Sequence, residues 1–330
     1  MKFGPVPLDD ARGAILAHSV SYSGGRLRKG RVIEAADQEV LARAGITEVT
    51  VARLDPGDIG EDHAAERLAR ALVPDPELAG LRLGKAATGR VNIYAQDIGV
   101  VEVLVDRIDA LNALHPMITV ATVPKWQRVS SRNMVATVKI IAYGVPEAAL
   151  DAACLAGQAG LRLRRVACNS ACLIQTTVDA GENGDRGYSA TKDRLDRMGV
   201  ALSPNQVVAH EIDPLATALK QANADILLIL TGSATSDALD VAPQALRAAG
   251  GEVTHFGMPV DPGNLLFFGH LQGKPVIGLP GCAKSPAMNG ADWVLERLLC
   301  GVPVTSQDIA GMGVGGLLKE IPQRGRLRDA

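Results

Sequence analysis

The sequence Ile226-Leu-Leu-Ile-Leu230 runs directly into Thr231-Gly-Ser-Ala-Thr-Ser-Asp-Ala-Leu-Asp240, and this stretch decides the fold of the C-terminal half. Five consecutive aliphatic residues predict a strand buried on both faces, and the small polar residues after them predict a turn. The pattern recurs at Pro275-Val-Ile-Gly-Leu279, which is followed by Pro280-Gly-Cys-Ala-Lys-Ser285 and a predicted helix from Ser285 to Leu299. Twice, a buried strand ends in a small-residue turn that opens a helix. Such turns direct backbone N–H groups and a helix dipole towards an anion.

Helical and strand-like segments alternate from Pro146 onward. Alternation of this kind predicts parallel strands joined by right-handed crossovers. We therefore predict an α/β fold, with a C-terminal three-layer, doubly wound, mostly parallel sheet. Ligands in such sheets bind at the carboxyl ends of the strands. The loops after Val178, Ala209, Leu230 and Leu279 are therefore expected to share one binding site.

The residues before Pro146 predict smaller α+β and β-rich units. Pro74-Asp-Pro76 interrupts a helical pattern and marks the first boundary. We predict an N-terminal α/β unit over residues 1–75 and a β-rich unit over 76–145. The main α/β domain is predicted over 146–305 and a C-terminal tail over 306–330.

Composition excludes several classes of protein. The chain has 330 residues, of which 47% are hydrophobic, and this content argues against disorder. A formal net charge of −2 gives no basic footprint for nucleic acid. Five cysteines without paired spacing fit a reducing compartment. The N-terminal residues carry no signal-peptide pattern, and no apolar run is long enough to span a membrane, so we expect a cytoplasmic protein.

The turn Thr231–Asp240 has residues suited to phosphate binding. Gly232 permits a positive φ or a close approach to a ligand, and the hydroxyls of Ser233, Thr235 and Ser236 can donate to phosphate oxygens. Asp237 and Asp240 repel a bare anion, so they fit this role if a divalent cation joins them to the phosphate. The alternative is a plain helix N-cap with acids in its first turn, which requires no ligand.

Two further turns offer weaker signals. Pro262-Gly263-Asn264 predicts a rigid turn in which Asn264 can donate or accept, although a simple type II turn has the same signature. Pro280-Gly281 followed by Lys284 and Ser285 suits a phosphate at a helix start, although Ser285 can also cap the helix without any ligand.

One acidic segment follows the strand Gln206–Ala209. His210-Glu211 can supply an acid, a base or a metal ligand to the same site, whereas Asp213 before Pro214 is typical of a helix N-cap.

The order of these motifs resembles a known family. The turn at 231–243, then Asp261-Pro-Gly-Asn-Leu-Leu-Phe-Phe-Gly269, then Gly278-Leu-Pro-Gly-Cys-Ala-Lys-Ser285, is similar to the molybdopterin-binding domain of molybdopterin adenylyltransferase and molybdopterin molybdotransferase. The resemblance covers roughly Arg164 to Gly301. A looser resemblance to the molybdotransferase lies at Leu27–Asp37 and Leu41–Val51.

The sequence departs from the family pattern at several positions. Thr231-Gly232 replaces a Gly-Gly pair, Asn264 replaces the lysine of Pro-Gly-Lys, and Cys282 replaces an amide residue after Leu-Pro-Gly. Asp240 is retained, but Gln244 stands where the adenylyltransferase has a second aspartate.

The resemblance implies a protein of molybdenum cofactor biosynthesis. Its ligand would be molybdopterin, Mo-molybdopterin or a nucleotide-activated form, and its reaction nucleotidyl transfer or molybdenum insertion with Mg²⁺. Expected partners are a nucleotide and other molybdenum cofactor enzymes, with no nucleic acid or membrane, in a homo-oligomer. The alternatives are a non-catalytic molybdopterin carrier or regulatory module, and a generic nucleotide or sugar-phosphate enzyme.

The predicted site has three sets of residues. The catalytic set is Asp240, Asp237 and Glu211, and the metal set is Asp240 and Asp237. The cofactor-binding set is Thr231, Gly232, Ser233, Thr235, Ser236, Pro262, Gly263, Asn264, Pro280, Gly281, Lys284 and Ser285.

Overall fold

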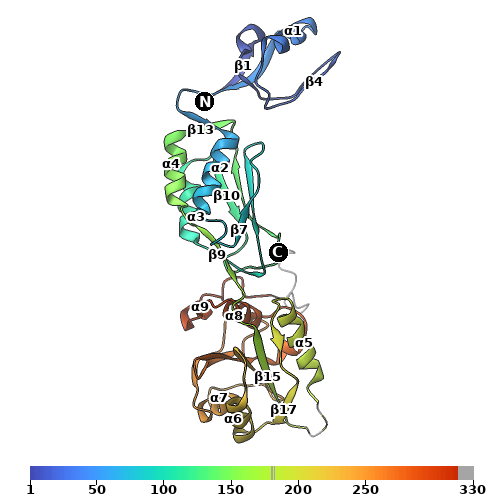
Figure 1. Ribbon diagram of the computed structural model, residues 1–330, viewed down its shortest axis with the longest axis vertical. Helices are drawn as coiled ribbons and strands as arrows, with labels where there is room; N and C mark the ends of the chain where they lie inside the picture. The colour runs from blue at the N-terminus through green and yellow to red at the C-terminus, as the bar shows by residue number, and fades with distance from the viewer. Residues whose placement is uncertain (180, 182, 319–330) are drawn as a thin grey trace. The chain divides into compact units, whose positions relative to one another are not determined.

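The computed structural model describes residues 1–179, 181 and 183–318, which form two compact units (Figure 1). Unit 1 comprises Met1–Asp97 and Val101–Leu163, and unit 2 comprises Ile98–Val100 and the residues from Arg164 onward. The predicted boundaries after residues 75, 145 and 305 stay predictions. Positions 319–330 of the predicted tail lie outside the described residues.

Unit 1 begins with a small antiparallel sheet in the order β1-β5-β2. A cluster of buried aliphatic side chains, including Leu16, Leu41 and Val51, holds the sheet against helix α1. The elements are β1 (Lys2–Pro7), η1 (Leu8–Ala11), β2 (Ile15–Leu16), the hairpin β3 (Val20–Tyr22) and β4 (Gly25–Leu27), α1 (Ala35–Arg43) and β5 (Glu48–Arg53).

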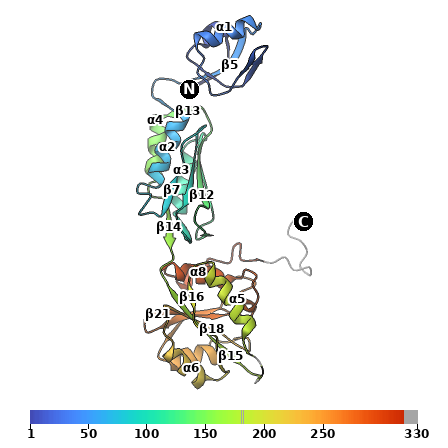
Figure 2. The same ribbon diagram turned by 45° about the vertical axis from the view of Figure 1, so that its right-hand side comes forward.

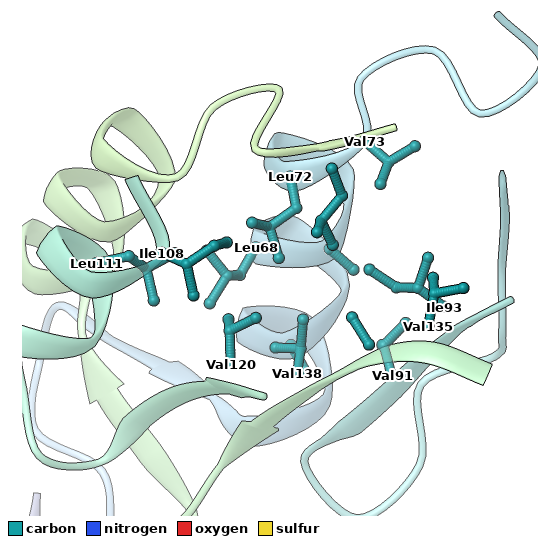
Figure 3. Close-up of a cluster of buried hydrophobic side chains, with 14 of the residues drawn as sticks. Leu68, Leu72, Val73, Val91, Ile93, Ile108, Leu111, Val120, Val135 and Val138 are labelled. Carbon is teal, nitrogen blue, oxygen red and sulfur yellow. The ribbon is translucent and has the colours of Figure 1, made fainter. Parts of the chain in front are cut away.

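The rest of unit 1 packs three helices on a four-stranded antiparallel sheet in the order β10-β12-β8-β7. Figure 3 shows Leu68 and Leu72 of α2 among Val91, Val120 and Val138 of the strands, all fully or almost fully buried. The helices are α2 (Glu61–Leu72), α3 (Val105–Leu114) and α4 (Glu147–Ala156). The strands are β7 (Leu81–Leu83), β8 (Arg90–Ala95), β10 (Ile118–Thr122) and β12 (Met134–Ile140), with the pair β6 (Asp58–Gly60) and β13 (Gly144–Pro146). A further sheet in the order β11-β9-β14 consists of β11 (Arg128–Val129), β9 (Gly99–Val103) and β14 (Leu161–Arg165), and the division between the two units falls within β9 and within β14.

Unit 2 is built on a seven-stranded sheet in the order β16-β15-β18-β21-β20-β19, with β17 paired to β15. The pairs of β15 with β16, β17 and β18 are parallel, as is the pair of β18 and β21, whereas β20 is antiparallel to both β21 and β19. All five residues of β18 are buried, as its aliphatic run predicted. The strands are β15 (Ser170–Thr177), β16 (Ala201–Leu202), β17 (Gln206–Ala209), β18 (Ile226–Leu230), β19 (Glu252–Phe256), β20 (Phe267–Leu271) and β21 (Lys274–Leu279).

Helices cover both faces of this sheet, as Figures 1 and 2 show, with α6 and α7 on one face and α5 and α8 on the other. The apolar faces of α6 and α7 pack on Cys172, Ile174 and Ile229 of the sheet. This three-layer, mostly parallel arrangement beside smaller antiparallel sheets confirms the predicted fold class. The helices are α5 (Asp185–Asp196), α6 (Ile212–Gln221), α7 (Val241–Ala248), η2 (Gly281–Lys284), α8 (Gly290–Leu299) and α9 (Ser306–Ala310).

Three local predictions in unit 2 were wrong or incomplete. The last large helix begins at Gly290 rather than Ser285, because Pro286 favours an extended Ser285 and Asn289 caps the helix with its side chain. Helix α6 begins at Ile212 after Glu211, which places Asp213 inside the first turn instead of at the N-cap. Strand β20 was not predicted at all.

None of the helices formed by the described residues combines the length and the apolar character needed to cross a membrane.

Candidate functional site

The candidate site lies at the carboxyl edge of the unit 2 sheet. Register pairs Thr177 of β15 with Ala209 of β17, and Leu230 of β18 with Leu279 of β21, so these parallel strands end at one edge. Strand β20 runs the opposite way, and its first residue, Phe267, pairs with Gly278. The loop that precedes β20 therefore joins the same edge. All fifteen predicted site residues lie on the loops of this edge.

The loop Thr231–Asp240 is anchored at its start. The Gly232 amide donates to Thr176 Oγ1 at 3.1 Å, and the buried hydroxyls of Thr231 and Thr235 lie 3.3 Å apart. A Cβ at Gly232 would lie 2.7 Å from the carbonyl oxygen of Thr176, and the Gly232 backbone is not left-handed. Glycine is therefore required here by close packing against β15, and this explains the residue without a ligand.

Three consecutive amides of this loop are available to an anion. Among the residues that the structure describes, no protein acceptor receives a hydrogen bond from the N–H groups of Ser233, Ala234 and Thr235. Ser233 and Ser236 are exposed and carry hydroxyls beside these amides. Successive unpartnered amides in a turn form concave sites for phosphate oxygens. Such amides can hold an anion without any cationic side chain.

The two aspartates of this loop hold its backbone. Asp240 Oδ1 accepts the Val241 amide at 2.7 Å as the N-cap of α7, and its Oδ2 accepts the Ser236 amide at 3.1 Å. Asp237 Oδ1 accepts the Leu239 amide at 2.7 Å. Asp240 is therefore an N-cap, as the alternative read from the sequence supposed, but the first turn of α7 holds no acid.

Metal binding by the same pair requires additional ligands. Over the described ranges, no three His, Cys, Asp or Glu side chains gather in a way that could hold a metal ion. Carboxylate oxygens retain free lone pairs after accepting one N–H each. Mg²⁺ commonly takes one or two carboxylates and completes its shell with phosphate oxygens and water. Asp237 and Asp240 therefore fit Mg²⁺ only together with a phosphorylated ligand.

The turn before β20 packs against the start of α8. Gly263 has a φ of +145°, and a Cβ there would lie 2.8 Å from the Gly290 nitrogen. The Gly290 amide donates to Pro262 O at 2.8 Å, and the exposed Asn264 donates through Nδ2 to Met258 O at 3.3 Å. The peptide bond between Asp261 and Pro262 is cis. This turn has a structural role in fixing α8, whatever ligand it contacts.

A buried arginine, Arg194 of α5, holds the loop after β21 and was not predicted as a site residue. Arg194 is 7% exposed, and its guanidinium group donates all five of its N–H groups. Nε donates to Asp292 Oδ1 at 2.5 Å. Nη1 donates to the carbonyl oxygens of Ala190 at 3.0 Å and Ala283 at 2.9 Å. Nη2 donates to the carbonyl oxygens of Ser285 at 2.8 Å and Ala287 at 3.0 Å. Arg194 thereby fixes the backbone on either side of Lys284 and Ser285.

The N-terminus of α8 does not offer the predicted anion site. Its first amides, from Gly290, Ala291 and Asp292, donate to Pro262 O and to Asn289 at 2.8 to 3.0 Å. In return, Asp292 Oδ2 accepts the Asn289 amide at 2.8 Å and completes a capping box. A ligand at Gly281, Lys284 and Ser285 would therefore meet the short η2 turn instead of the α8 dipole.

Thr176 and His210 form a second unpredicted contact at the ends of β15 and β17. Thr176 Oγ1 lies 2.7 Å from His210 Nδ1, so the hydroxyl that accepts the Gly232 amide also binds the imidazole. Glu211 is exposed beside it. No sequence motif marks the contact, because it depends on the alignment of three separate strand ends.

Exposed apolar side chains complete the edge. Each loop presents at least one large side chain to solvent, namely Val178, Ile212, Leu239, Leu265 and Met288. Binding sites for organic ligands combine apolar walls with a few polar groups. The edge can therefore contact a ring system and a phosphate together.

A cavity of about 370 Å³ lies in unit 1, lined by residues that include Asp75, Leu78, Glu102 and Leu104. Its walls are mainly apolar and hold no residue of the predicted site. The chemistry-bearing loops of the chain are in unit 2, and we assign the candidate site there.

Comparison with known families agrees with this assignment. Residues 171–299 match a family described as "Probable molybdopterin binding domain", and residues 5–53 match one described as "Domain of unknown function (DUF8806)". The resemblance read from the loops of unit 2 is thus confirmed as a match to this family over residues 171–299. No curated protein matches the chain.

Several solved structures are similar at low identity. A molybdopterin biosynthesis moeA protein from Pyrococcus horikosii is 14% identical over 94% of this chain and 76% of its own, with a TM-score of 0.30. A molybdenum cofactor biosynthesis protein from Pyrococcus furiosus is 13% identical over 94% of this chain and 65% of its own, with a TM-score of 0.21. The CinA protein of unknown function from Thermoplasma acidophilum is 18% identical over 35% of this chain and 90% of its own, with a TM-score of 0.25.

Proposed function

We propose that the carboxyl edge of unit 2 binds molybdopterin, its molybdenum-loaded form or its nucleotide-activated form, as a step of molybdenum cofactor biosynthesis. The observation that carries the proposal is the run of three unpartnered amides at Ser233, Ala234 and Thr235, inside the matched domain. These amides and the neighbouring hydroxyls would hold the phosphate. The apolar side chains of the edge would contact the ring.

The proposed chemistry is nucleotidyl transfer to the pterin or insertion of molybdenum into it. Asp240 and Asp237, with Mg²⁺ and the ligand phosphate, would neutralise charge at the reacting phosphate, and bound Mg²⁺ supplies Lewis-acid polarisation. Glu211 follows β17 at the same edge, where its carboxylate could act as an acid or base. Lys284 and Ser285, on the loop fixed by Arg194, would contact a second phosphate.

One alternative is a carrier or regulatory module that binds the pterin without reacting. It is favoured by the backbone hydrogen bonds of Asp240, which use both carboxylate oxygens. It is also favoured by Asn264, Cys282 and Gln244, which replace the residues expected of the reactive family members. A third reading, a generic nucleotide or sugar-phosphate enzyme, uses the same amides and apolar edge.

Binding and turnover assays separate these readings. Purified protein is titrated calorimetrically with molybdopterin, with the dephosphorylated pterin, and with ATP and CTP. The proposal predicts binding of the phosphorylated pterin and loss of that binding when the phosphate is removed. Retained nucleotide binding without pterin binding would favour the generic enzyme.

The reaction is assayed in the same preparation. The pterin is supplied with ATP and Mg²⁺, and the adenylylated pterin is supplied with molybdate and Mg²⁺. Product in either reaction supports the enzyme. Tight pterin binding without either product supports the carrier.

The expected setting is the cytoplasm, with a nucleotide and other molybdenum cofactor enzymes as partners and a homo-oligomer as the working form. Five cysteines without a disulfide suit a reducing compartment. Sedimentation of the purified protein tests the oligomer.

A further inference from the structure

His210 stands where three strands of the candidate site end. It follows β17 directly, Thr176 is the second-last residue of β15, and Gly232 lies two residues after the end of β18. The His210 amide donates to Thr177 O at 3.0 Å, which continues the pairing of β17 with β15. The imidazole is half-buried and its Nδ1 lies 2.7 Å from Thr176 Oγ1. The backbone and the ring of His210 are therefore both held by β15.

The Thr176 hydroxyl determines which nitrogen of His210 carries the proton. Thr176 is 4% exposed, and its oxygen already accepts the Gly232 amide at 3.1 Å. A buried hydroxyl hydrogen needs an acceptor. Among the described residues, Thr176 Oγ1 has two hydrogen-bond partners, the Gly232 amide and His210 Nδ1. Because the amide can only donate, His210 Nδ1 accepts the hydroxyl hydrogen. Nδ1 is therefore unprotonated in the neutral ring, and the hydrogen lies on Nε2.

None of the hydrogen bonds among the described residues gives the Nε2–H group of His210 a protein acceptor. A single hydroxyl thus contacts both this imidazole and the Gly232 amide of the loop Thr231–Asp240. The amides that follow, from Ser233 to Thr235, are the donors assigned to the phosphate. We propose that His210 contacts the ligand, donating Nε2–H to an oxygen of the phosphorylated pterin, and that Thr176 is the positioning residue that fixes its tautomer. This inference rests on the proposed function.

The structure supplies a matched control at the opposite edge of the same sheet. His270 lies near the end of β20, and its Nδ1 is 3.4 Å from Thr254 Oγ1. Because β20 runs antiparallel to β21 and starts at the carboxyl edge, its end is remote from the proposed ligand. Replacing His270 removes a similar His–Thr pair without touching the site.

The tautomer is read first, without ligand. Long-range ¹H–¹⁵N spectra of histidine-labelled protein are recorded in a buffer alkaline enough to keep imidazole neutral, and the signal lost in His210→Phe identifies the residue among six histidines. We expect the Nε2–H form in the wild type and in Thr176→Ser, which keeps the hydroxyl. A predominant Nδ1–H form in the wild type would overturn the assignment. In Thr176→Val, if it folds, we expect a mixture.

Binding is read second, with a pterin phosphate monoester as the probe. We expect His210→Phe to raise the Kd roughly three- to tenfold, the range for one lost neutral hydrogen bond, and His270→Phe to leave it unchanged. Equal binding by the wild type and His210→Phe would overturn the role of His210 while leaving the proposed function intact. Failure of the wild type to bind the probe would overturn both.

Discussion

Replacement of Arg194 by methionine should loosen the loop that carries Lys284 and Ser285. The substitution removes five hydrogen bonds and leaves the carboxylate of Asp292 without its cationic partner. Breaking a buried ion pair from one side costs about 3–5 kcal/mol. Arg194→Lys keeps the charge but offers three donors in a different geometry, so we expect a loss of about 1–2 kcal/mol.

Lys192→Met is the matched control on the same helix. The Lys192 ammonium lies 2.6 Å from Asp196, but both side chains are about half exposed, at 50% and 55%. An exposed pair of this kind contributes little to stability, because water and salt screen it. Arginine, lysine and methionine have similar helix propensities, so the comparison isolates the buried contacts.

Urea unfolding followed by tryptophan fluorescence measures the difference. The chain has two tryptophans, and Trp293 lies in α8 next to Asp292. In a Trp126→Phe background the signal reports unit 2 alone. We also expect faster amide exchange over residues 281–289 in Arg194→Met. If Arg194→Met loses no more free energy of unfolding than Lys192→Met, the assignment of Arg194 as the anchor of this loop is wrong.

Three further predictions concern single residues. Asp240→Asn should keep the α7 cap but lose metal-dependent turnover. Asp240→Ala should lose the turnover and also about 0.5–2 kcal/mol of stability, because the cap is removed. Wild-type turnover in either variant refutes the catalytic role of Asp240. Gly232→Ala should destabilise unit 2 by roughly 1–3 kcal/mol in the same urea assay, because the new Cβ would lie 2.7 Å from Thr176 O, and an unchanged midpoint would contradict this. Burial raises the pKa of the Cys300 thiol from 9.0 to about 12, so Cys300 should resist alkylation in the native protein at mildly alkaline pH. The contribution of the buried, protonated thiol to stability is fully present below pH 9.0 and is lost as the pH rises towards 12. Rapid labelling of Cys300 in the native protein, read by peptide mass, would refute the burial argument.

The central strands of unit 2 could be predicted because the signal is local. Ile226–Leu230 is a short aliphatic run between turn residues, and such a run has few alternatives to a buried strand. Strand β20 was missed, although Gln272-Gly273, both in the left-handed region, close a hairpin with β21 and offered a turn signal. The start of α8 was misplaced because Ser285 is a plausible cap, while the decisive capping box of Asn289 and Asp292 lies further along the chain.

The polar network of the site could not be read from the sequence. Arg194 donates to carbonyl oxygens about 90 residues away, and main-chain acceptors leave no trace in residue identities. The pair of Thr176 and His210 likewise depends on strand register. The sequence identified the loops that could bind phosphate, because turn residues are local, but not the side chains that hold those loops in place.

The proposed ligand of the carboxyl edge of unit 2 is a phosphorylated pterin. The most direct measurement is mass spectrometry of the small molecule released by denaturing protein purified from a molybdenum-replete host, with Arg194→Met purified in parallel as the loosened site. We expect the mass of molybdopterin, its molybdenum-loaded form or its nucleotide-activated form from the wild type, and less of it from Arg194→Met. Release of an ordinary nucleotide or sugar phosphate, with no pterin, would show that the carboxyl edge does not bind a pterin.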